Sequence, residues 1–450
     1  MEKGKERIEE KNILQKTITA FLVGIYFDPS SKKTCDEHLE ELKELARTCG
    51  FEVVGMKACP LKKISSSTYL GKGKIQELIS DVEQTSADLI IFDEEISPNQ
   101  ERNLEKLFNR VILDRTGLIL EVFARRAQTR EAKIQIELAK SRYEFPRLKR
   151  LWTHLSRQSA SGGGGGMYLR GAGERQIEID RRLIKKRITS LQKELLEVRM
   201  HRQLQRQARL RSKIFTIAIV GYTNTGKSTL LNALTHSQVL AEDKLFATLD
   251  TTTRKATLPN HQEVLYIDTV GFIRKLPHAL VAAFKSTLEE VLYTDLLIHL
   301  IDVSHPMALE QAETTYEVLK ELKALHRPII TVLNKIDKIS DRGKIHRFRI
   351  KYPKTVGISA LTGEGIEELL QLIIKEIQNL CYTCTLRISQ KEYGVLSRLI
   401  QEGEILEQYY EDNDIIVKIT LPKRMQSQVS PYICLLYTSD AADERSGVDL

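Results

Sequence analysis

The chain has few cysteines for its length. Its 450 residues include six cysteines, a number that does not suggest a disulfide-stabilised secreted fold and favours a reducing compartment. Cys381 and Cys384 form a C-x-x-C pair, but no second pair accompanies them as a zinc site requires. We therefore interpret them as two free thiols. The remaining cysteines have no partner at the spacing of a metal site: Cys35, Cys49, Cys59 and Cys434.

Long apolar segments are also absent. No run of roughly 18 or more apolar residues occurs, so a membrane-spanning helix is not expected. The first residues, MEKGKERIEEKN, lack the apolar core of a signal peptide, and their acidic side chains argue against a transit peptide. We expect a cytoplasmic protein, with peripheral association with a membrane left open.

The positive charge is concentrated in one segment. The whole chain has a net charge of +8, yet residues 147–213 alone contain 18 Lys and Arg against 5 Asp and Glu. Such a concentration is typical of a surface that binds a polyanion, with nucleic acid as the leading candidate. The length predicts about three domains, with room for a smaller fourth.

The N-terminal part, residues 13–117, alternates strand-like and helix-like stretches. Strands are expected at 17–26, 51–56, 89–92 and 110–113, and helices at 34–49, 73–84 and 99–107. This alternation predicts an α/β domain with parallel strands. The glycine loop from Gly71 to Lys74 precedes a helix, and two interpretations stay open: a structural turn or a weak nucleotide-binding loop.

Residues 118–212 are expected to form a basic helical hairpin. The spacing of apolar residues predicts one long helix over 118–143 and a second over 174–213. Between them, five consecutive glycines, Gly162–Gly166, cannot form a packed core and predict a loop. The alternatives are a flexible spacer between domains and an ordinary solvated helix over 118–143.

The segment FTIAIVGYTNTGKSTLL, residues 215–231, contains a phosphate-binding motif. A β-branched run, 215–220, leads into a loop that matches G-x-x-x-x-G-K-[ST] from Gly221 to Ser228. The glycines allow backbone N–H groups to surround a phosphate. Lys227 is expected to reach the β- and γ-phosphates, and the Ser228 hydroxyl to bind Mg²⁺. A glycine turn without a ligand is the alternative.

Three further motifs follow strand-like runs in the order expected of a nucleotide hydrolase. Asp268–Gly271 matches D-x-x-G, with the carboxylate for Mg²⁺ and the Gly271 N–H for the γ-phosphate. Asn334–Asp337 selects guanine, because the Asp337 carboxylate can accept two hydrogen bonds that adenine cannot donate. Ser359–Leu361 offers a backbone N–H to the guanine carbonyl. Together these motifs predict a GTPase.

A threonine upstream of these motifs is expected to complete the Mg²⁺ site. Thr248, in Phe246–Asp250, is the second expected hydroxyl ligand, with Thr251, Thr252 and Thr253 as rivals.

One catalytic group of Ras-like GTPases is missing. The residue after D-x-x-G is often a glutamine that orients the attacking water, but here it is Phe272. We therefore expect slow intrinsic hydrolysis and a partner that supplies or orders the missing geometry.

The whole chain resembles the HflX family of ribosome-associated GTPases over about residues 15–420. The resemblance is carried by GYTNTGKSTLLNALT, LFATLD, DTVGFIRKLPHALVAAFKSTLEE, NKID, TYLGKGK, TGLILEVFARRAQTREAKIQIELA and the glycine loop before RGAGERQIEIDRR. It implies an α/β fold in which a P-loop GTPase domain, 213–380, follows the α/β domain and the hairpin. A small α/β domain, 381–433, is expected next. That domain is expected to be truncated, and 434–450 is an atypical tail.

The resemblance also implies a function and a site. It implies binding of the large ribosomal subunit and its RNA through the basic hairpin, and a role in splitting or rescuing ribosomes under stress, in a monomeric protein. GTP is the substrate and Mg²⁺ the cofactor, with Ser228 and Thr248 as metal ligands and Lys227 and Gly271 as catalytic groups. The implied nucleotide contacts are Gly221, Tyr222, Thr223, Asn224, Thr225, Gly226, Lys227, Ser228, Phe246, Ala247, Thr248, Leu249, Asp250, Asp268, Thr269, Val270, Gly271, Asn334, Lys335, Ile336, Asp337, Ser359, Ala360 and Leu361.

Two other functions are compatible with the sequence. In the first, GTP fixes the conformation of an RNA- or protein-binding regulator and hydrolysis is incidental. In the second, the N-terminal domain uses ATP to remodel RNA, for which the Gly71–Lys74 loop is the only support.

Overall fold

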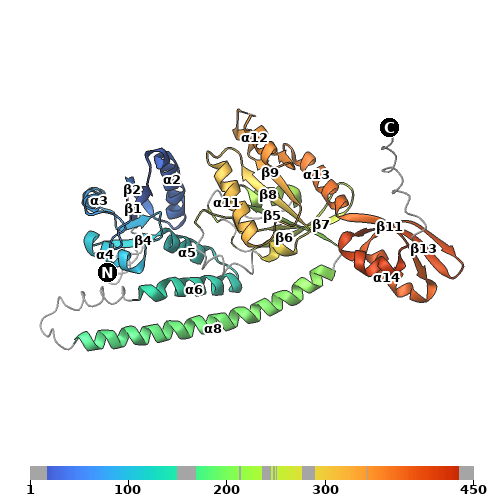
Figure 1. The fold of residues 1–450 in the computed structure, drawn as a ribbon, viewed down its shortest axis with the longest axis horizontal. Helices are drawn as coiled ribbons and strands as arrows, with labels where there is room; N and C mark the ends of the chain where they lie inside the picture. Colours follow the sequence, from blue (N-terminus) through green and yellow to red (C-terminus); the bar gives the residue numbers. More distant parts are fainter. Residues whose placement is uncertain are drawn as a thin grey trace, which may run out of the picture.

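A computed structural model describes residues 18–148, 169–211, 214–235, 245–246, 249, 251–275, 289–341 and 343–434. Three β-sheets follow one another along the chain, and long helices connect the first to the second (Figure 1). Among these residues, no helix is both long enough and apolar enough to cross a membrane.

The first sheet has four strands, which are all parallel as predicted, and the structure arranges them in the order β2-β1-β3-β4. Helices cover both of its faces, because successive strand residues point to opposite sides. Helices α2 and α5 cover one face, and α3 and α4 cover the other. The bounds are β1 Thr19–Tyr26, β2 Glu52–Pro60, β3 Leu89–Phe92, β4 Val111–Asp114, η1 Pro29–Ser31, α2 Lys32–Thr48, α3 Lys72–Thr85 and α4 Pro98–Phe108.

The single helix predicted over 118–143 is wrong. Two helices occupy this stretch, α5 (Arg115–Arg126) and α6 (Arg130–Glu144). Ala127 ends α5 in an extended conformation, and the Thr129 hydroxyl accepts a hydrogen bond from the N–H of Ala132, which caps the start of α6. Both helices contribute buried residues to the core cluster that includes the first sheet, Leu118 and Phe123 from α5 and Ala132 and Ile136 from α6.

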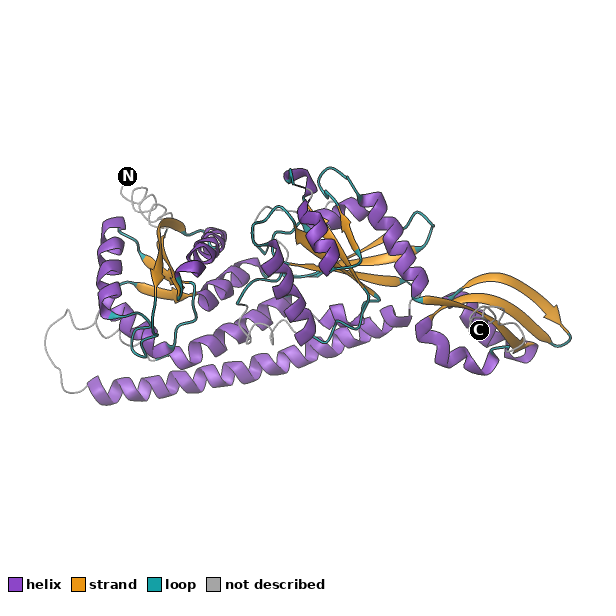
Figure 2. Ribbon diagram, turned by 45° about the horizontal axis from the view of Figure 1, so that its top comes forward, coloured by secondary structure: helices purple, strands orange, loops and turns teal. Residues whose placement is uncertain are grey.

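A 43-residue helix, α8 (Leu169–Arg211), runs alongside α6 (Figure 2). Ile134 and Leu138 of α6 pack against Leu191 and Leu195 of α8 in a small apolar seam. The chain between η2 (Phe145–Arg147) and α8 includes the five glycines, and that prediction lies outside the described residues.

The second sheet has six strands in the order β10-β9-β8-β5-β7-β6, all parallel except β6. Central strands β5 and β8 are buried along their whole length apart from Thr216 of β5. The bounds are β5 Phe215–Gly221, β6 Thr252–Thr257, β7 Glu263–Asp268, β8 Leu296–Asp302, β9 Ile329–Asn334, β10 Thr355–Gly357, α9 Lys227–Thr235, α11 Ala308–Glu321, α12 Gly343–Lys351, α13 Ile366–Asn379, η3 Glu289–Tyr293 and η4 Ile336–Lys338.

The third sheet is a small antiparallel one in the order β11-β13-β12. Helix α14 packs its apolar residues on one face. The bounds are β11 Cys381–Ser389, β12 Glu404–Glu411, β13 Asp414–Pro422, α14 Tyr393–Glu402, α15 Gln426–Val429, η5 Gln390–Glu392, η6 Lys423–Met425 and η7 Ser430–Tyr432. Of the atypical tail, only Cys434 belongs to the described residues.

Candidate functional site

The predicted P-loop connects β5 to α9, at the carboxyl edge of the second sheet. At two positions of this loop, neighbouring atoms leave no room for a side chain. A Cβ atom on Gly221 would lie 2.3 Å from the Leu300 carbonyl oxygen, and one on Gly226 would lie 2.5 Å from Nδ2 of Asn334. Gly226 also has a φ of 92°, which side chains rarely adopt. The loop is therefore held close to β8 and β9.

Lys227 begins α9 and lies under the loop. Its Nζ donates hydrogen bonds to the carbonyl oxygens of Tyr222 at 2.7 Å and Gly221 at 3.3 Å. Burial lowers the pKa of Lys227 to about 8, although the nearby Asp268 carboxylate raises it in part. An anion bound next to this ammonium group offsets part of the free-energy cost of burying its charge.

Two oxygen-bearing side chains meet beside Lys227. The Ser228 hydroxyl donates a hydrogen bond of 2.7 Å to the carboxylate of Asp268, which ends β7 and is fully buried. A hydroxyl and a carboxylate suit Mg²⁺, which takes oxygen ligands and completes its shell with water and phosphate. The third predicted ligand, Thr248, lies outside the described residues, as do Ala247 and Asp250. The rival candidates Thr252 and Thr253 lie on β6.

Side chains of the N-K-x-D motif, at the end of β9, donate hydrogen bonds to the P-loop backbone. Nδ2 of Asn334 donates to the Thr225 carbonyl at 2.8 Å, and its Oδ1 accepts from the N–H of Ala360 at 3.0 Å. Lys335 donates to the carbonyl of Asn224 at 2.9 Å. The structure therefore brings three predicted segments to one place, while the Asp337 side chain remains exposed to solvent.

The D-x-x-G segment lies directly on the P-loop. The N–H of Phe272 donates to Gly221 O at 3.0 Å, and the N–H of Thr223 donates to Phe272 O at 2.8 Å. A Cβ atom on Gly271 would lie 2.9 Å from Nζ of Lys227. The Phe272 side chain is 1% exposed and belongs to an apolar cluster that also contains Tyr222. It therefore contributes packing to this segment and no hydrogen bond.

Two residues of the predicted segment Phe246–Asp250 are described, Phe246 and Leu249, and both belong to the apolar cluster that includes helix α5. Phe246 is buried and meets Phe123 of α5 edge to face, with ring centroids 4.5 Å apart. Leu249 is buried in the same cluster, which joins the core of the first sheet to that of the second. The remaining predicted residues Thr269, Val270 and Ser359 are buried, Ile336 is partly buried, and Leu361 is exposed.

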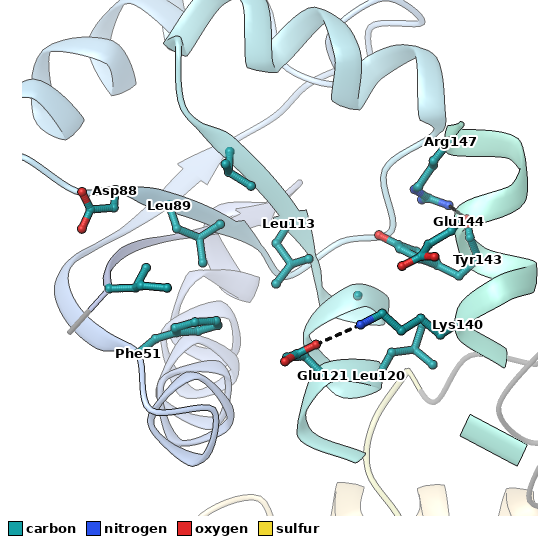
Figure 3. A pocket seen from close by; sticks show the side chains of 13 residues that line it. Phe51, Asp88, Leu89, Leu113, Leu120, Glu121, Lys140, Tyr143, Glu144 and Arg147 are labelled. Carbon is teal, nitrogen blue, oxygen red and sulfur yellow. Dashed lines mark hydrogen bonds and ion pairs between the residues drawn. The ribbon is translucent and has the colours of Figure 1, made fainter. Parts of the chain in front are cut away.

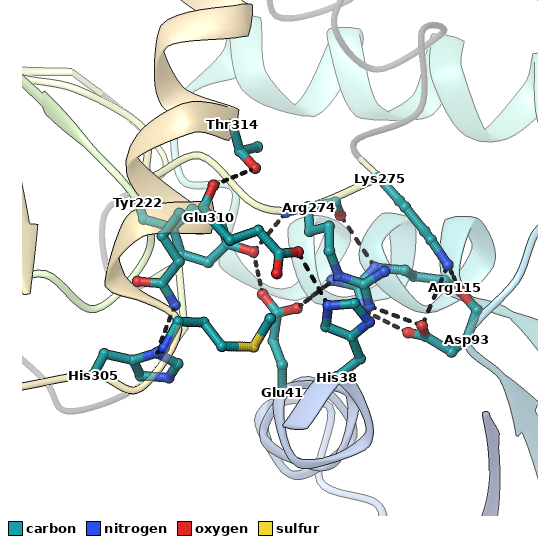
Figure 4. A network of polar contacts seen from close by, with 12 residues as sticks. His38, Glu41, Asp93, Arg115, Tyr222, Arg274, Lys275, His305, Glu310 and Thr314 are labelled. Carbon is teal, nitrogen blue, oxygen red and sulfur yellow. Dashed lines mark hydrogen bonds and ion pairs between the residues drawn. The ribbon is translucent and has the colours of Figure 1, made fainter. Parts of the chain in front are cut away.

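Sequence reasoning missed a buried polar network between the first sheet and the P-loop (Figure 4). The Tyr222 hydroxyl donates to the carboxylate of Glu41, on α2, and accepts from the N–H of Arg274 at 2.7 Å. Arg115, at the start of α5, donates to Glu41 at 2.8 Å and to Asp93 at 2.7 Å. Arg274 donates to Asp93 at 2.8 Å. One network therefore links the P-loop, the D-x-x-G segment and the carboxyl edge of the first sheet.

The charges in this network stabilise one another. Burial alone would raise the pKa of Asp93, but the cations of Arg115, Arg274 and Lys275 outweigh it and lower that pKa to about 2. Burial raises the pKa of Tyr222 well above its ordinary value, so its hydroxyl stays protonated and able to donate. One feature of the sequence indicates this network. Asp93 directly follows a buried parallel strand, and polar groups of α/β domains gather at the carboxyl ends of such strands.

A cavity of about 840 Å³ lies at the opposite, amino edge of the first sheet (Figure 3). Its apolar lining includes Phe51, Leu89 and Leu113, and its rim includes Glu121 and Lys140, which form an ion pair of 3.3 Å. The Gly71–Lys74 loop follows the carboxyl end of β2 and does not line this cavity.

Helix α8 presents a row of exposed polar side chains. The row is formed by Arg182, Lys185, Lys186, Thr189, Ser190 and Lys193. These positions recur at helical spacing and therefore share one face. A face with four cations and no acid suits a polyanion such as a nucleic-acid backbone.

Three family models match the chain in succession. They are described as GTP-binding GTPase N-terminal (residues 36–124), GTP-binding GTPase Middle Region (126–209) and 50S ribosome-binding GTPase (216–335).

Similar proteins cover nearly the whole chain. It is 47% identical over 426 residues to the GTPase HflX of Chlamydia pneumoniae, which covers 94% of this chain and 90% of that protein. It is 41% identical over 405 residues to the GTPase HflX of Escherichia coli (strain K12), which covers 90% and 93% respectively. Among solved structures, it is similar to a GTP-binding protein from the hyperthermophilic archaeon Sulfolobus solfataricus in complex with GDP, at 28% identity and a TM-score of 0.42, with 80% of this chain and 98% of that chain covered.

Proposed function

Because this chain belongs to the HflX family of ribosome-associated GTPases, we propose that it couples GTP binding and hydrolysis on the large ribosomal subunit to the splitting or rescue of ribosomes under stress. The observation that carries the ribosomal part is the basic face of α8, defined by Arg182, Lys185, Lys186 and Lys193. Ribosomal RNA is the polyanion that this face fits. The protein acts in the cytoplasm as a monomer.

GTP is held by the segments that meet at the carboxyl edge of the second sheet. The backbone of Gly221–Ser228 surrounds the phosphates. The Lys227 ammonium group, which donates to the carbonyl oxygens of Gly221 and Tyr222 in the structure, turns to the β- and γ-phosphates when the nucleotide binds. Ser228 and Asp268 would hold Mg²⁺ directly or through water, and the ion would neutralise phosphate charge. Thr248 is the proposed second hydroxyl ligand. Gly271 donates its N–H to the γ-phosphate.

The guanine base is selected by the Asn334–Asp337 segment. The Asp337 carboxylate is exposed and accepts hydrogen bonds from the N1–H and exocyclic amine of guanine. The Asn334 side chain connects the end of β9 to Thr225 and Ala360 through hydrogen bonds. The Ala360 segment is thereby positioned to offer its backbone to the guanine carbonyl oxygen.

The ribosome accelerates hydrolysis. Phe272 is buried in the apolar cluster and cannot orient a water molecule, so the intrinsic rate is low. Docking of the α8 face on ribosomal RNA orders the segments around the γ-phosphate. If hydrolysis is instead incidental, the protein is a GTP-switched RNA- or protein-binding regulator, and its turnover does not respond to the ribosome.

The test is steady-state GTP hydrolysis with and without purified large ribosomal subunits, at low and high salt. We expect stimulation that declines as salt rises, because phosphate contacts release counterions. A Lys185→Glu, Lys186→Glu double variant should lose most of the stimulation and keep the intrinsic rate. The matched control is Lys320→Glu on α11, an exposed lysine outside the basic face. Equal rates with and without subunits would support the regulator.

A further inference from the structure

The P-loop contains a buried hydroxyl group that the nucleotide contacts described above do not use. Thr223 is 5% exposed, and its Oγ1 has no hydrogen-bond partner among the described residues. The other hydroxyls of the loop differ from it. Thr225 Oγ1 donates to the Tyr222 carbonyl at 3.0 Å, and Ser228 Oγ donates to Asp268 at 2.7 Å. A buried hydroxyl without a partner is costly and calls for an explanation.

Thr223 lies where the P-loop meets the D-x-x-G segment. Its N–H donates to Phe272 O at 2.8 Å. A Cβ atom on Gly271 would lie 2.8 Å from Cγ2 of Thr223, 2.9 Å from its Cα and 2.9 Å from Nζ of Lys227. The threonine side chain, the ammonium group and Gly271 therefore surround one small region, the same region that is proposed above for the γ-phosphate.

Among the described residues that meet at Gly271, Lys227 supplies a charged side-chain donor. Phe272 supplies none, and its ring is buried in the apolar cluster. Phosphoryl oxygens accept hydrogen bonds and cannot donate them unless protonated, so they match an unpartnered hydroxyl donor. Donors fixed in advance around a reacting phosphoryl group stabilise its transition state without reorganising.

We propose that Thr223 is a catalytic residue for GTP hydrolysis, whose hydroxyl donates a hydrogen bond to an equatorial oxygen of the γ-phosphoryl group. The water oxygen forms a bond to the γ-phosphorus as the bond to the β–γ bridging oxygen breaks, and GDP leaves with that electron pair. Both protons of the water end on the inorganic phosphate product. Thr223 keeps its own proton throughout. This inference rests on the γ-phosphate position between Lys227 and Gly271 proposed above.

Three variants of the full-length protein test this role: Thr223→Val, Thr223→Ser and Lys227→Ala. Valine has nearly the shape of threonine but no hydroxyl, whereas serine keeps the hydroxyl and loses the methyl group. The measurements are single-turnover GTP hydrolysis without ribosomes, equilibrium binding of GDP and GTP, and the thermal midpoint of the nucleotide-free protein.

We expect Thr223→Val to hydrolyse bound GTP roughly tenfold to hundredfold more slowly, within the range known for losing one transition-state donor. Its thermal midpoint should equal or exceed that of the wild type, because a buried unpartnered group has been removed. Its affinity for GDP should stay within about threefold, since GDP has no γ-phosphate. Thr223→Ser should recover most of the lost rate.

Several results would overturn the proposal. A Thr223→Val rate within about twofold of wild type would show that the hydroxyl has no catalytic role. An equal loss of rate in Thr223→Ser, or a parallel loss of GDP affinity and thermal stability in Thr223→Val, would indicate a packing role. Lys227→Ala separates this failure from failure of the GTP site. If Thr223→Val and Lys227→Ala both keep the wild-type rate, the proposed position of the γ-phosphate is wrong. If Lys227→Ala loses rate and Thr223→Val does not, only the role of Thr223 is rejected.

Discussion

Replacing Asp93 by asparagine tests whether the buried network holds the first sheet against the P-loop. Asp93 is 3% exposed and pairs with Arg115 at 2.7 Å and with Arg274 at 2.8 Å. Asparagine keeps the shape of the side chain but removes its charge, which leaves the two guanidinium groups with less compensation. Removing one partner of a buried ion pair costs about 3–5 kcal/mol of the free energy of unfolding.

The lowered pKa of Asp93 gives a second value for the free energy of unfolding that Asp93→Asn loses. A decrease from 3.8 to about 2 corresponds to about 2 kcal/mol, since one pKa unit is equivalent to about 1.4 kcal/mol. The folded-state pKa lies below the unfolded one, so this stability is complete above about pH 5 and is lost as the pH falls toward 2. We therefore expect Asp93→Asn to lose about 2–5 kcal/mol at pH 7, and to lose less than the wild type on further acidification.

The assay is urea unfolding followed by circular dichroism at pH 7 and at several lower pH values. Glu94→Gln is the matched control, because Glu94 lies next in the chain and pairs with Lys275, but both side chains are more exposed. That change should cost about 1 kcal/mol or less. The reasoning would be refuted if Asp93→Asn cost no more free energy of unfolding than Glu94→Gln, or if Asp93→Asn lost as much stability on acidification as the wild type.

Three further outcomes follow from the geometry. Asp337→Asn should weaken GTP binding at least roughly hundredfold in a fluorescent-nucleotide titration, because the amide cannot accept both guanine hydrogen bonds; unchanged affinity would contradict the base assignment. Gly226→Ala should abolish GTP binding in the same titration, since its Cβ would meet Asn334, while Gly73→Ala, with no atom within 4 Å, should not. Leu191→Ala should cost about 2–5 kcal/mol in urea unfolding, because Leu191 is 1% exposed in the seam between α6 and α8.

The sequence predicted the local structure well where local physics decides it. The strand at 89–92 was placed at its observed bounds, because four apolar residues in succession between polar ones are typical of a buried parallel strand. The P-loop was also located, because its motif has glycine at the two positions where a side chain would collide, Gly221 with the Leu300 carbonyl and Gly226 with the Asn334 side chain.

Other features of the structure could not be predicted from the spacing of apolar residues along the chain. The break before α6 arises from the cap formed by Thr129, which an apolar pattern continuing on both sides concealed. The contact between Tyr222 and Glu41 joins residues 181 positions apart, so it depends on how two separately folded sheets pack. The same limit applies to Thr223, because no sequence pattern shows that its hydroxyl finds no hydrogen-bond partner among the described residues.

The uninterrupted length of α8 has a mechanical consequence. A helix of 43 residues is about 64 Å long at a rise of about 1.5 Å per residue. If one end of such a rod is held, a rotation of about 5° moves the other end by about 6 Å, a distance similar to one helical turn. A small rotation of α8 at the end that reaches the second sheet therefore displaces its other end by several ångströms. The apolar seam between α6 and α8 resists this movement.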